Sequence, residues 1–209
     1  MTAGLLTPAP VVQGFVLCLS LIVAIGPQNA FLLRVGTSGR NAYLAAWISA
    51  LCDLTLIVLG AFGLGSVLTT HPGLVTAARW AGAAYLCFLG AQTIRQALRE
   101  PGLDVDSSGS LPLRTTGQTV RLTLGFAFLN PHVYIDTVGL MGAAGSVYPL
   151  PLRLSFVAGA ATGSFLWFNL LVTLGAILGR WLAQPRARRI FDATVGLILF
   201  GSAVWLAIG

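Results

Sequence analysis

Two short stretches decide how this sequence is interpreted: residues 24–31 read AIGPQNAF, and residues 128–136 read FLNPHVYID. Each places a proline and side-chain amides inside a long apolar run. A proline removes one backbone hydrogen bond of a helix and kinks it, which frees carbonyl groups where water is scarce. Transmembrane helices also tolerate proline simply as a kink. Two such breaks, each flanked by amides, are nevertheless typical of a transport site.

The composition around these breaks is that of a membrane protein. Of 209 residues, 56% are hydrophobic and 9% are charged, and the mean hydropathy is +0.85. Soluble domains carry about 25% charged residues, so this chain has too few charges to cover a water-facing surface. Helices of about 20 residues cross about 30 Å of hydrocarbon. We therefore predict an all-α, polytopic membrane protein with six transmembrane helices, at approximately residues 11–33, 42–68, 74–96, 122–148, 154–179 and 190–208.

The longest gap between these runs divides the chain into two halves. Residues 101–118 are rich in Pro, Gly, Ser and Asp, a composition typical of linkers. We predict a first three-helix repeat over residues 1–100, a cytoplasmic linker over 101–118 and a second repeat over 119–209. With three spans in each half, the second repeat is inverted relative to the first. Pro27 and Pro131 then break the corresponding helices, one and four, and are expected to act as hinges.

The arginines predict the orientation of the chain. All twelve basic residues are Arg, and ten of them, Arg34 among them, lie in the gaps after spans one, three and five. Only Arg79 and Arg153 lie near the opposite side, where Trp205 would mark the outer interface. Because cytoplasmic loops carry the excess of basic residues, we expect these gaps in the cytoplasm and both termini outside a bacterial inner membrane. The net charge of +6 is thus explained by lipid headgroups rather than by nucleic acid.

Three ionisable residues fall at one depth inside the predicted membrane. Counted from the cytoplasmic ends of their helices at 1.5 Å per residue, Asp53, Arg79 and Asp136 lie about 18–22 Å deep. Charges at such a depth pair with one another or line an aqueous cavity. Asp53 and Arg79 could form a structural salt bridge between spans two and three. One carboxylate is then left over, which makes Asp136 the leading candidate for holding a substrate cation or a proton.

Other polar residues near the breaks are candidates for the same site. Gln28, Asn29 and Asn130 could bind the α-carboxylate or the α-ammonium group of a substrate. His132 could bind substrate or protons, or only hydrogen-bond a freed carbonyl, and the sequence leaves both readings open. Asp192 lies at the start of span six beside arginines, where helix capping or an interfacial ion pair explains it.

Small residues and missing motifs add two expectations. Span five carries glycines at GxxxG spacing, which predicts close helix contact, either inside the chain or in a homodimer. The sequence has no GxSxG, HExxH or Walker motif and no paired-histidine metal cluster. We therefore expect a transporter that uses an ion or substrate gradient, not an enzyme, and we expect neither a cofactor nor a metal. The glycines are Gly159, Gly163, Gly175 and Gly179.

The segments that carry these features resemble the LysE family of lysine and arginine exporters. The resemblance follows the whole chain in order, at residues 25–31, 52–54, 79–86, 129–136 and 164–168. It implies a secondary transporter that exports L-arginine and/or L-lysine in exchange for protons. It also implies functional importance for Asp53, Arg79, Asn130 and Asp136.

Within that family, Asn130-Pro131-His132 is more similar to the arginine-exporter branch. Two alternatives remain at this point. The chain could export a neutral amino acid or another small cation, or it could be a membrane assembly or scaffold protein whose buried charges are purely structural.

Overall fold

The computed structural model of this chain describes residues 8–23, 26–64, 72–98, 115–130, 133–181 and 184–208. Within these ranges the protein is all-α and contains no strand. The elements are α1 (Pro8–Ile22), α2 (Pro27–Ser38), α3 (Ala42–Leu59), the π-helical segment η1 (Gly60–Leu64), α5 (Pro72–Leu98), α6 (Thr116–Phe128), the π-helical segment η2 (Tyr134–Met141), α8 (Gly142–Ser146), α9 (Leu150–Trp181) and α10 (Pro185–Ile208).

Two stretches of the described chain are helical, long and apolar enough to cross a membrane. They are Ala42–Gly63, with 22 residues, and Leu150–Trp181, with 32 residues. Helices α1 and α2, which are bent by 84° relative to each other, add a third if they count as one span. Helices α5 and α10 contain 27 and 24 residues, which exceeds the about 20 residues that a crossing needs. The complete six-span arrangement stays a prediction.

Both predicted breaks separate one helix from the next. Helix α2 begins at Pro27, where the missing N–H costs nothing because the first N–H groups of a helix have no partner within it. Helix α6 ends at Phe128, and the chain is helical again from Tyr134 in η2. Pro131 and His132 themselves lie outside the described residues. The predicted linker falls largely outside them too, and residues 115–118, at its end, form the capping box that begins α6.

A side chain beyond each break hydrogen-bonds a carbonyl that the break frees. In the first half the amide of Asn29 donates to the carbonyl of Ile22, the last residue of α1. In the second half the hydroxyl of Tyr134 donates to the carbonyl of Phe128, the last residue of α6, at 2.9 Å. Because lipid offers no hydrogen bonds, a broken helix in a membrane needs such internal partners. In both halves, a side chain that follows the break satisfies the carbonyl of the last residue of the helix before it.

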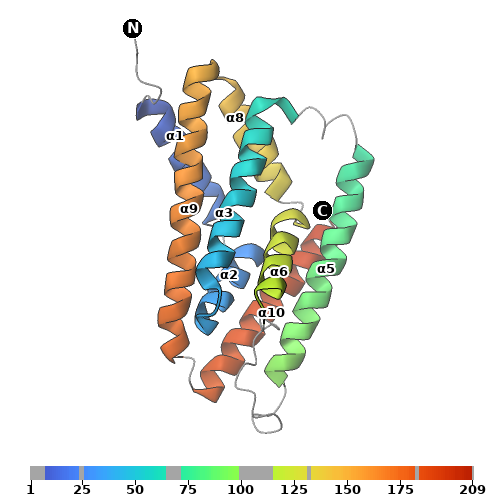
Figure 1. Ribbon diagram of the computed structural model, residues 1–209. Helices are drawn as coiled ribbons and strands as arrows, with labels where there is room; N and C mark the ends of the chain where they lie inside the picture. Colours follow the sequence, from blue (N-terminus) through green and yellow to red (C-terminus); the bar gives the residue numbers. More distant parts are fainter. Residues whose placement is uncertain are drawn as a thin grey trace.

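The helices pack in pairs that correspond between the halves. In Figure 1 the chain alternates in direction: α1 and α2 descend, α3 ascends, α5 descends, α6 with η2 and α8 ascends, α9 descends and α10 ascends. Helix α1 packs on α9 as α6 packs on α3, and α2 packs on α9 as η2 packs on α3. Helices α5 and α10, the last of each half, pack on each other. The division into two inverted three-helix repeats stays a prediction.

The predicted glycine stripe of α9 lies inside the chain. A Cβ at Gly159 would lie 1.9 Å from the carbonyl oxygen of Val11 in α1, and one at Gly175 would lie 2.2 Å from that of Leu33 in α2. Only a residue without a side chain permits these approaches. Of the two interpretations that the sequence leaves open for this stripe, internal packing is the one observed.

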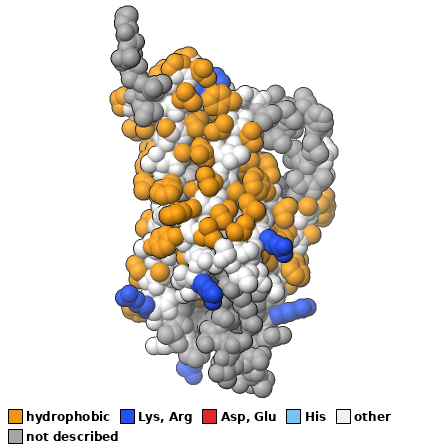
Figure 2. All heavy atoms as spheres, in the orientation of Figure 1, with side chains coloured by type: hydrophobic (Ala, Val, Ile, Leu, Met, Phe, Trp, Pro, Cys, Tyr) orange, Lys and Arg blue, Asp and Glu red, His pale blue; other side chains and the backbone are white. Residues whose placement is uncertain are grey.

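Arginine side chains mark one end of the molecule. Figure 2 shows hydrophobic side chains over the middle and upper parts of one face, and Arg side chains gathered toward its lower end with one near the top. The lower end in Figure 1 is where α2, α5 and α9 end and α6 begins. We call it the arginine-rich end, and its exposed members include Arg40, Arg95 and Arg121.

The prediction for Arg34 is wrong. This residue does not mark an exposed gap but belongs to α2, and its side chain is only 2% exposed. Its guanidinium forms an ion pair with Asp192 of α10, at 3.3 Å. Asp192 is thus paired across the fold, whereas the sequence suggests a local cap or an interfacial pair. The hydropathy pattern ends span one at Leu33 and so assigns the next residue to a loop.

Candidate functional site

A cavity of about 390 Å³ lies between the two breaks. Its size falls within the about 300–1,000 Å³ of small-molecule sites. The beginnings of α2 and η2, the middle of α3 and parts of α5, α9 and α10 contribute to its walls. Five of the residues that the sequence predicts for the site line it: Gln28, Asn29, Asp53, Asn130 and Asp136.

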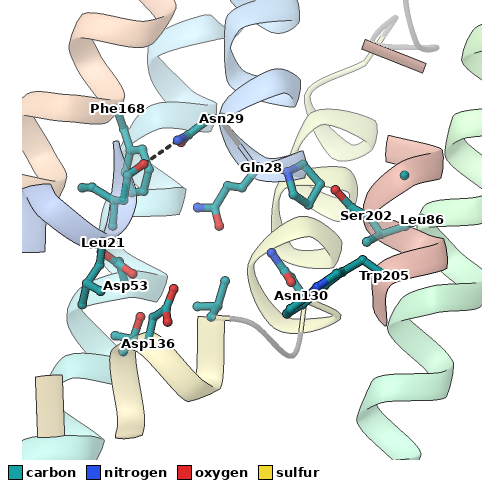
Figure 3. Close-up of a pocket in the computed structure, with 16 residues that line it drawn as sticks. Leu21, Gln28, Asn29, Asp53, Leu86, Asn130, Asp136, Phe168, Ser202 and Trp205 are labelled. Carbon is teal, nitrogen blue, oxygen red and sulfur yellow. Dashed lines mark hydrogen bonds between the residues drawn. The ribbon is translucent and has the colours of Figure 1, made fainter. Parts of the chain in front are cut away.

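The carboxylates of Asp53 and Asp136 lie on the same side of this cavity. Asp53 comes from the middle of α3, and Asp136 from the first turn of η2. Figure 3 shows their carboxyl groups close together, with Asn130, Ser202 and Trp205 on the opposite side of the view. Asp136 is partly exposed to the cavity, whereas Asp53 is only 5% exposed. Both residues, for which the sequence predicts a common depth, lie in the same wall of the cavity.

Hydroxyl groups from the second half of the chain hold the Asp53 carboxylate. The Ser164 hydroxyl of α9 donates a hydrogen bond to Asp53 Oδ2, and the Thr137 hydroxyl of η2 hydrogen-bonds the same carboxylate. Ser164 Oγ also lies 3.1 Å from the thiol of Cys18 in α1. Asp53 therefore stands where α1, α3, η2 and α9 meet. Hydrogen bonds to a carboxylate are stronger than those between neutral groups, and they fix its orientation.

The predicted pairing of Asp53 with Arg79 stays a prediction. Arg79 belongs to α5, but its side chain is outside the part of the structure that is described. Among the side chains that are described, the partners of Asp53 are hydroxyl groups and none is a cation.

The side-chain amides of Asn29 and Gln28 have different surroundings. The Asn29 side chain donates to the Ile22 carbonyl, the bond drawn dashed in Figure 3, and its oxygen accepts from the Trp167 indole at 3.4 Å. Asn29 therefore has a structural task. Gln28 precedes it in the first turn of α2, and in Figure 3 its side chain extends between the carboxylates and Asn130. Gln28 is the better placed of the two to contact a molecule in the cavity.

Helix α10 supplies a wall that the sequence did not predict. Gly201, Ser202 and Trp205 line the cavity from this helix. The sequence suggests that Trp205 marks the membrane interface, since an aromatic residue near the end of an apolar run has that meaning most often. Ser202 carries no motif. Only the packing of α10 against α5 and α2 brings these side chains to the cavity.

Two parts of the cavity wall differ in their electrostatic character. Asp53 and Asp136 supply negative charge on one side. The first turn of α2, residues 26–29, also lines the cavity, and the N-terminus of a helix carries a partial positive charge. A solute with a cationic group and a carboxylate matches both parts. Broken helices that present such termini at the midplane are how secondary transporters bind charged substrates.

Apolar helices around a cavity that two carboxylates line, between two helix breaks, are typical of a membrane transporter. The family model described as LysE type translocator matches residues 19–209, and the chain belongs to this family. Its members are transporters in the membrane, not enzymes.

The relatives are similar to this chain over nearly its whole length. A protein of Aeromonas salmonicida named "Putative amino-acid transporter YggA" is 40% identical over 201 residues, which are 96% of this chain and 97% of the relative. The "Arginine exporter protein ArgO" of Pectobacterium carotovorum is 33% identical over 195 residues, 93% of this chain and 95% of the relative. The protein of that name from Yersinia enterocolitica is 34% identical, over 93% and 94% of the two chains. No solved structure matches the chain.

Proposed function

We propose that this protein exports basic L-amino acids, arginine and/or lysine, from the cytoplasm in exchange for protons. The single observation that carries this proposal is the presence of two carboxylates, Asp53 and Asp136, in one cavity between two helix breaks of an apolar chain. An intramembrane acid is costly and usually serves function. The relatives named arginine exporter support the same substrate class.

In the proposed complex, Asp136 pairs with the cationic side chain of the substrate. Its partial exposure to the cavity makes it the more accessible of the two acids. The α-carboxylate binds at the first turn of α2, where Gln28 and the backbone N–H groups offer donors. Asn130 contributes a further amide on the other side of the cavity. The substrate thus bridges the two breaks, which belong to different halves of the chain.

The proposed topology has six spans in two inverted repeats. Helices α1 and α2 together form the first span, and α6, η2 and α8 together form the fourth. The exposed arginines of the arginine-rich end support its assignment to the cytoplasm, with both termini outside. The matched contacts of α1 on α9 and of α6 on α3 support the repeat.

Proton exchange follows from electrostatics. Moving one positive charge out of the cell against 100 mV costs about 2.3 kcal/mol. The exchange of one substrate cation for one proton moves no net charge. A carboxylate that binds the substrate cation when ionised and a proton when empty performs this exchange within a single site.

The test is efflux from membrane vesicles loaded with labelled arginine or lysine, with and without an imposed proton gradient. Asp136→Asn keeps the size of the side chain but removes its charge, so we expect normal folding and loss of proton-driven efflux. Asp136→Glu keeps the charge and should retain part of the activity. Asp106→Asn, an acid-to-amide change in the predicted linker, is the matched control and should transport normally.

Normal proton-driven arginine efflux by a folded Asp136→Asn variant would remove Asp136 from the mechanism. Efflux of a neutral amino acid by the unchanged protein, without efflux of arginine or lysine, would point to the alternative substrate class.

A further inference from the structure

A second polar cluster lies outside the cavity, and the proposed binding mechanism does not use it. Arg34 of α2 pairs with Asp192 of α10 at 3.3 Å, and its Nη1 donates to the hydroxyl of Thr93 in α5 at 2.9 Å. The side chains of Arg34 and Asp192 are 2% and 10% exposed, and Thr93 is fully buried. A buried ion pair contributes little net stability because both charges lose their hydration. Its presence therefore calls for another reason.

The cluster bridges a seam between two groups of helices. Helix α5 packs along α10, and within the described chain its backbone approaches no other helix as closely. Helix α2 packs mainly along α9, and its contact with α10 is much smaller. Helices α5 and α10 thus form one unit, and α2 belongs to the rest of the bundle. The guanidinium of Arg34 in α2 crosses this seam and bonds to both α5, through Thr93, and α10, through Asp192.

The cavity lies on the same seam. Leu86 of α5 and Gly201 of α10 line it from one side, and α2, α3 and η2 line it from the other. Thr93 lies seven residues beyond Leu86, about 10 Å along α5, and Asp192 lies nine residues before Gly201, about 13 Å along α10. Thr93 and Asp192 therefore both lie between the cavity and the arginine-rich end of the molecule.

Buried side chains close the seam between the cavity and this cluster. They come from α2, α5 and α10 and are at most 3% exposed. They include Phe31, Leu32, Val35, Leu89, Val195 and Leu199. In this structure a solute in the cavity therefore has no open route along this seam to the arginine-rich end.

We propose that Arg34, Asp192 and Thr93 form the gate between the cavity and the arginine-rich end, and that this structure has the gate closed. The inference rests on the proposed function in so far as a substrate must pass this end. Opening separates the α5–α10 unit from α2, which breaks the ion pair and the hydrogen bond to Thr93 together. Rocking of one bundle against another around a fixed site is how repeat-built transporters alternate access.

The test measures access to the cavity and needs no transport. The three native cysteines, Cys18, Cys52 and Cys87, are replaced by Ser, and Ser202→Cys places a single thiol in the cavity wall. Intact cells and inside-out vesicles are treated with an impermeant thiol reagent. A separate Arg40→Cys protein shows which preparation exposes the arginine-rich end, so that the result does not depend on the predicted orientation.

The double variant Arg34→Gln/Asp192→Asn removes the ion pair without leaving a buried charge alone. We expect its cavity thiol to react about tenfold faster from the arginine-rich end, the change in an open-to-closed ratio that one lost charge-assisted hydrogen bond produces. Thr93→Val keeps the ion pair and the shape of the side chain, and should give a smaller increase. Arg40→Gln, which removes an exposed arginine at the same end, is the matched control and should change nothing.

Equal labelling of the parent and of both gate variants, in protein that elutes as a single folded species, would overturn the gate. So would a faster reaction from the opposite end alone. Since labelling requires no substrate, the gate can be confirmed even if the solute is not a basic amino acid. If labelling is unchanged in the gate variants while the parent protein exports arginine, the gate is overturned and the proposed function still stands.

Discussion

Two buried carboxylates of this protein have opposite surroundings. Asp192 faces the guanidinium of Arg34, a full positive charge from another helix. Asp53 receives hydrogen bonds from the hydroxyls of Ser164 and Thr137, and the described side chains include no cation at this position. Both residues are deeply buried. Among the described side chains, they differ in whether the fold supplies a balancing charge.

The difference indicates that the two carboxylates have different roles. A carboxylate with its own guanidinium attracts a mobile cation weakly, because the site is already neutral, and such a pair suits a contact that forms and breaks as a unit. Hydroxyl donors orient a carboxylate without neutralising it. Under the proposed function, the charge of Asp53, which lies beside Asp136 in the cavity wall, is balanced by a proton or by a substrate cation. The comparison makes three predictions about stability.

The largest effect is expected where a charge is left alone. Asp192→Asn leaves the guanidinium of Arg34 buried without a counter-charge, which should destabilise the protein by about 3–5 kcal/mol. The free energy of unfolding, measured by denaturant titration in detergent micelles, reports the change. The yield of folded protein should fall with it.

The double variant Arg34→Gln/Asp192→Asn is the control for this first prediction. It removes both charges, so most of the lost stability should return, and the difference from additivity measures the coupling of the pair. A double variant no more stable than Asp192→Asn alone would show that the two side chains do not depend on each other.

A smaller effect is expected in the hydroxyl cluster. Ser164→Ala removes a buried hydrogen bond to a charged acceptor, which should cost about 1.5–3 kcal/mol. Thr162 of the same helix is exposed and bonds only the Ala158 carbonyl of its own helix, at 2.8 Å. Thr162→Ala should therefore change stability by no more than about 0.5 kcal/mol. Equal effects of the two substitutions in the same titration would mean that Ser164 contributes nothing through Asp53.

The sequence predicts much of this arrangement because its strongest features are local. Each break is marked by a proline within a run of apolar residues, and α2 begins at Pro27 as that pattern indicates. Counting residues along straight helices predicts one depth for Asp53 and Asp136, and both line the same cavity. The glycine spacing of α9 likewise predicts close packing, observed at Gly159 and Gly175.

What the sequence misses depends on contacts between distant segments. Arg34 directly follows an apolar run and resembles a loop residue, and its partner Asp192 belongs to the last helix. Nothing local distinguishes it from the exposed Arg40. Ser202 and Trp205 reach the cavity through the packing of α10, which no spacing in the sequence records. Asn29 carries the pattern of a binding residue, but one end of its amide is used by the break itself.

The smallest change in stability is expected for Asp53→Asn, and this prediction decides whether the comparison holds. An amide oxygen still accepts hydrogen bonds from Ser164 and Thr137, and no described cation loses its partner. The free energy of unfolding should therefore change by about 1 kcal/mol or less, while arginine efflux from vesicles is lost because the charge is gone. If the variant were instead as unstable as Asp192→Asn, then Asp53 would have a cationic partner after all. Arg79 is the residue that the sequence proposes, and the double variant Asp53→Asn/Arg79→Gln would then recover stability. A stable, folded Asp53→Asn protein without efflux means that this carboxylate is kept charged for the transported ions and not for the fold.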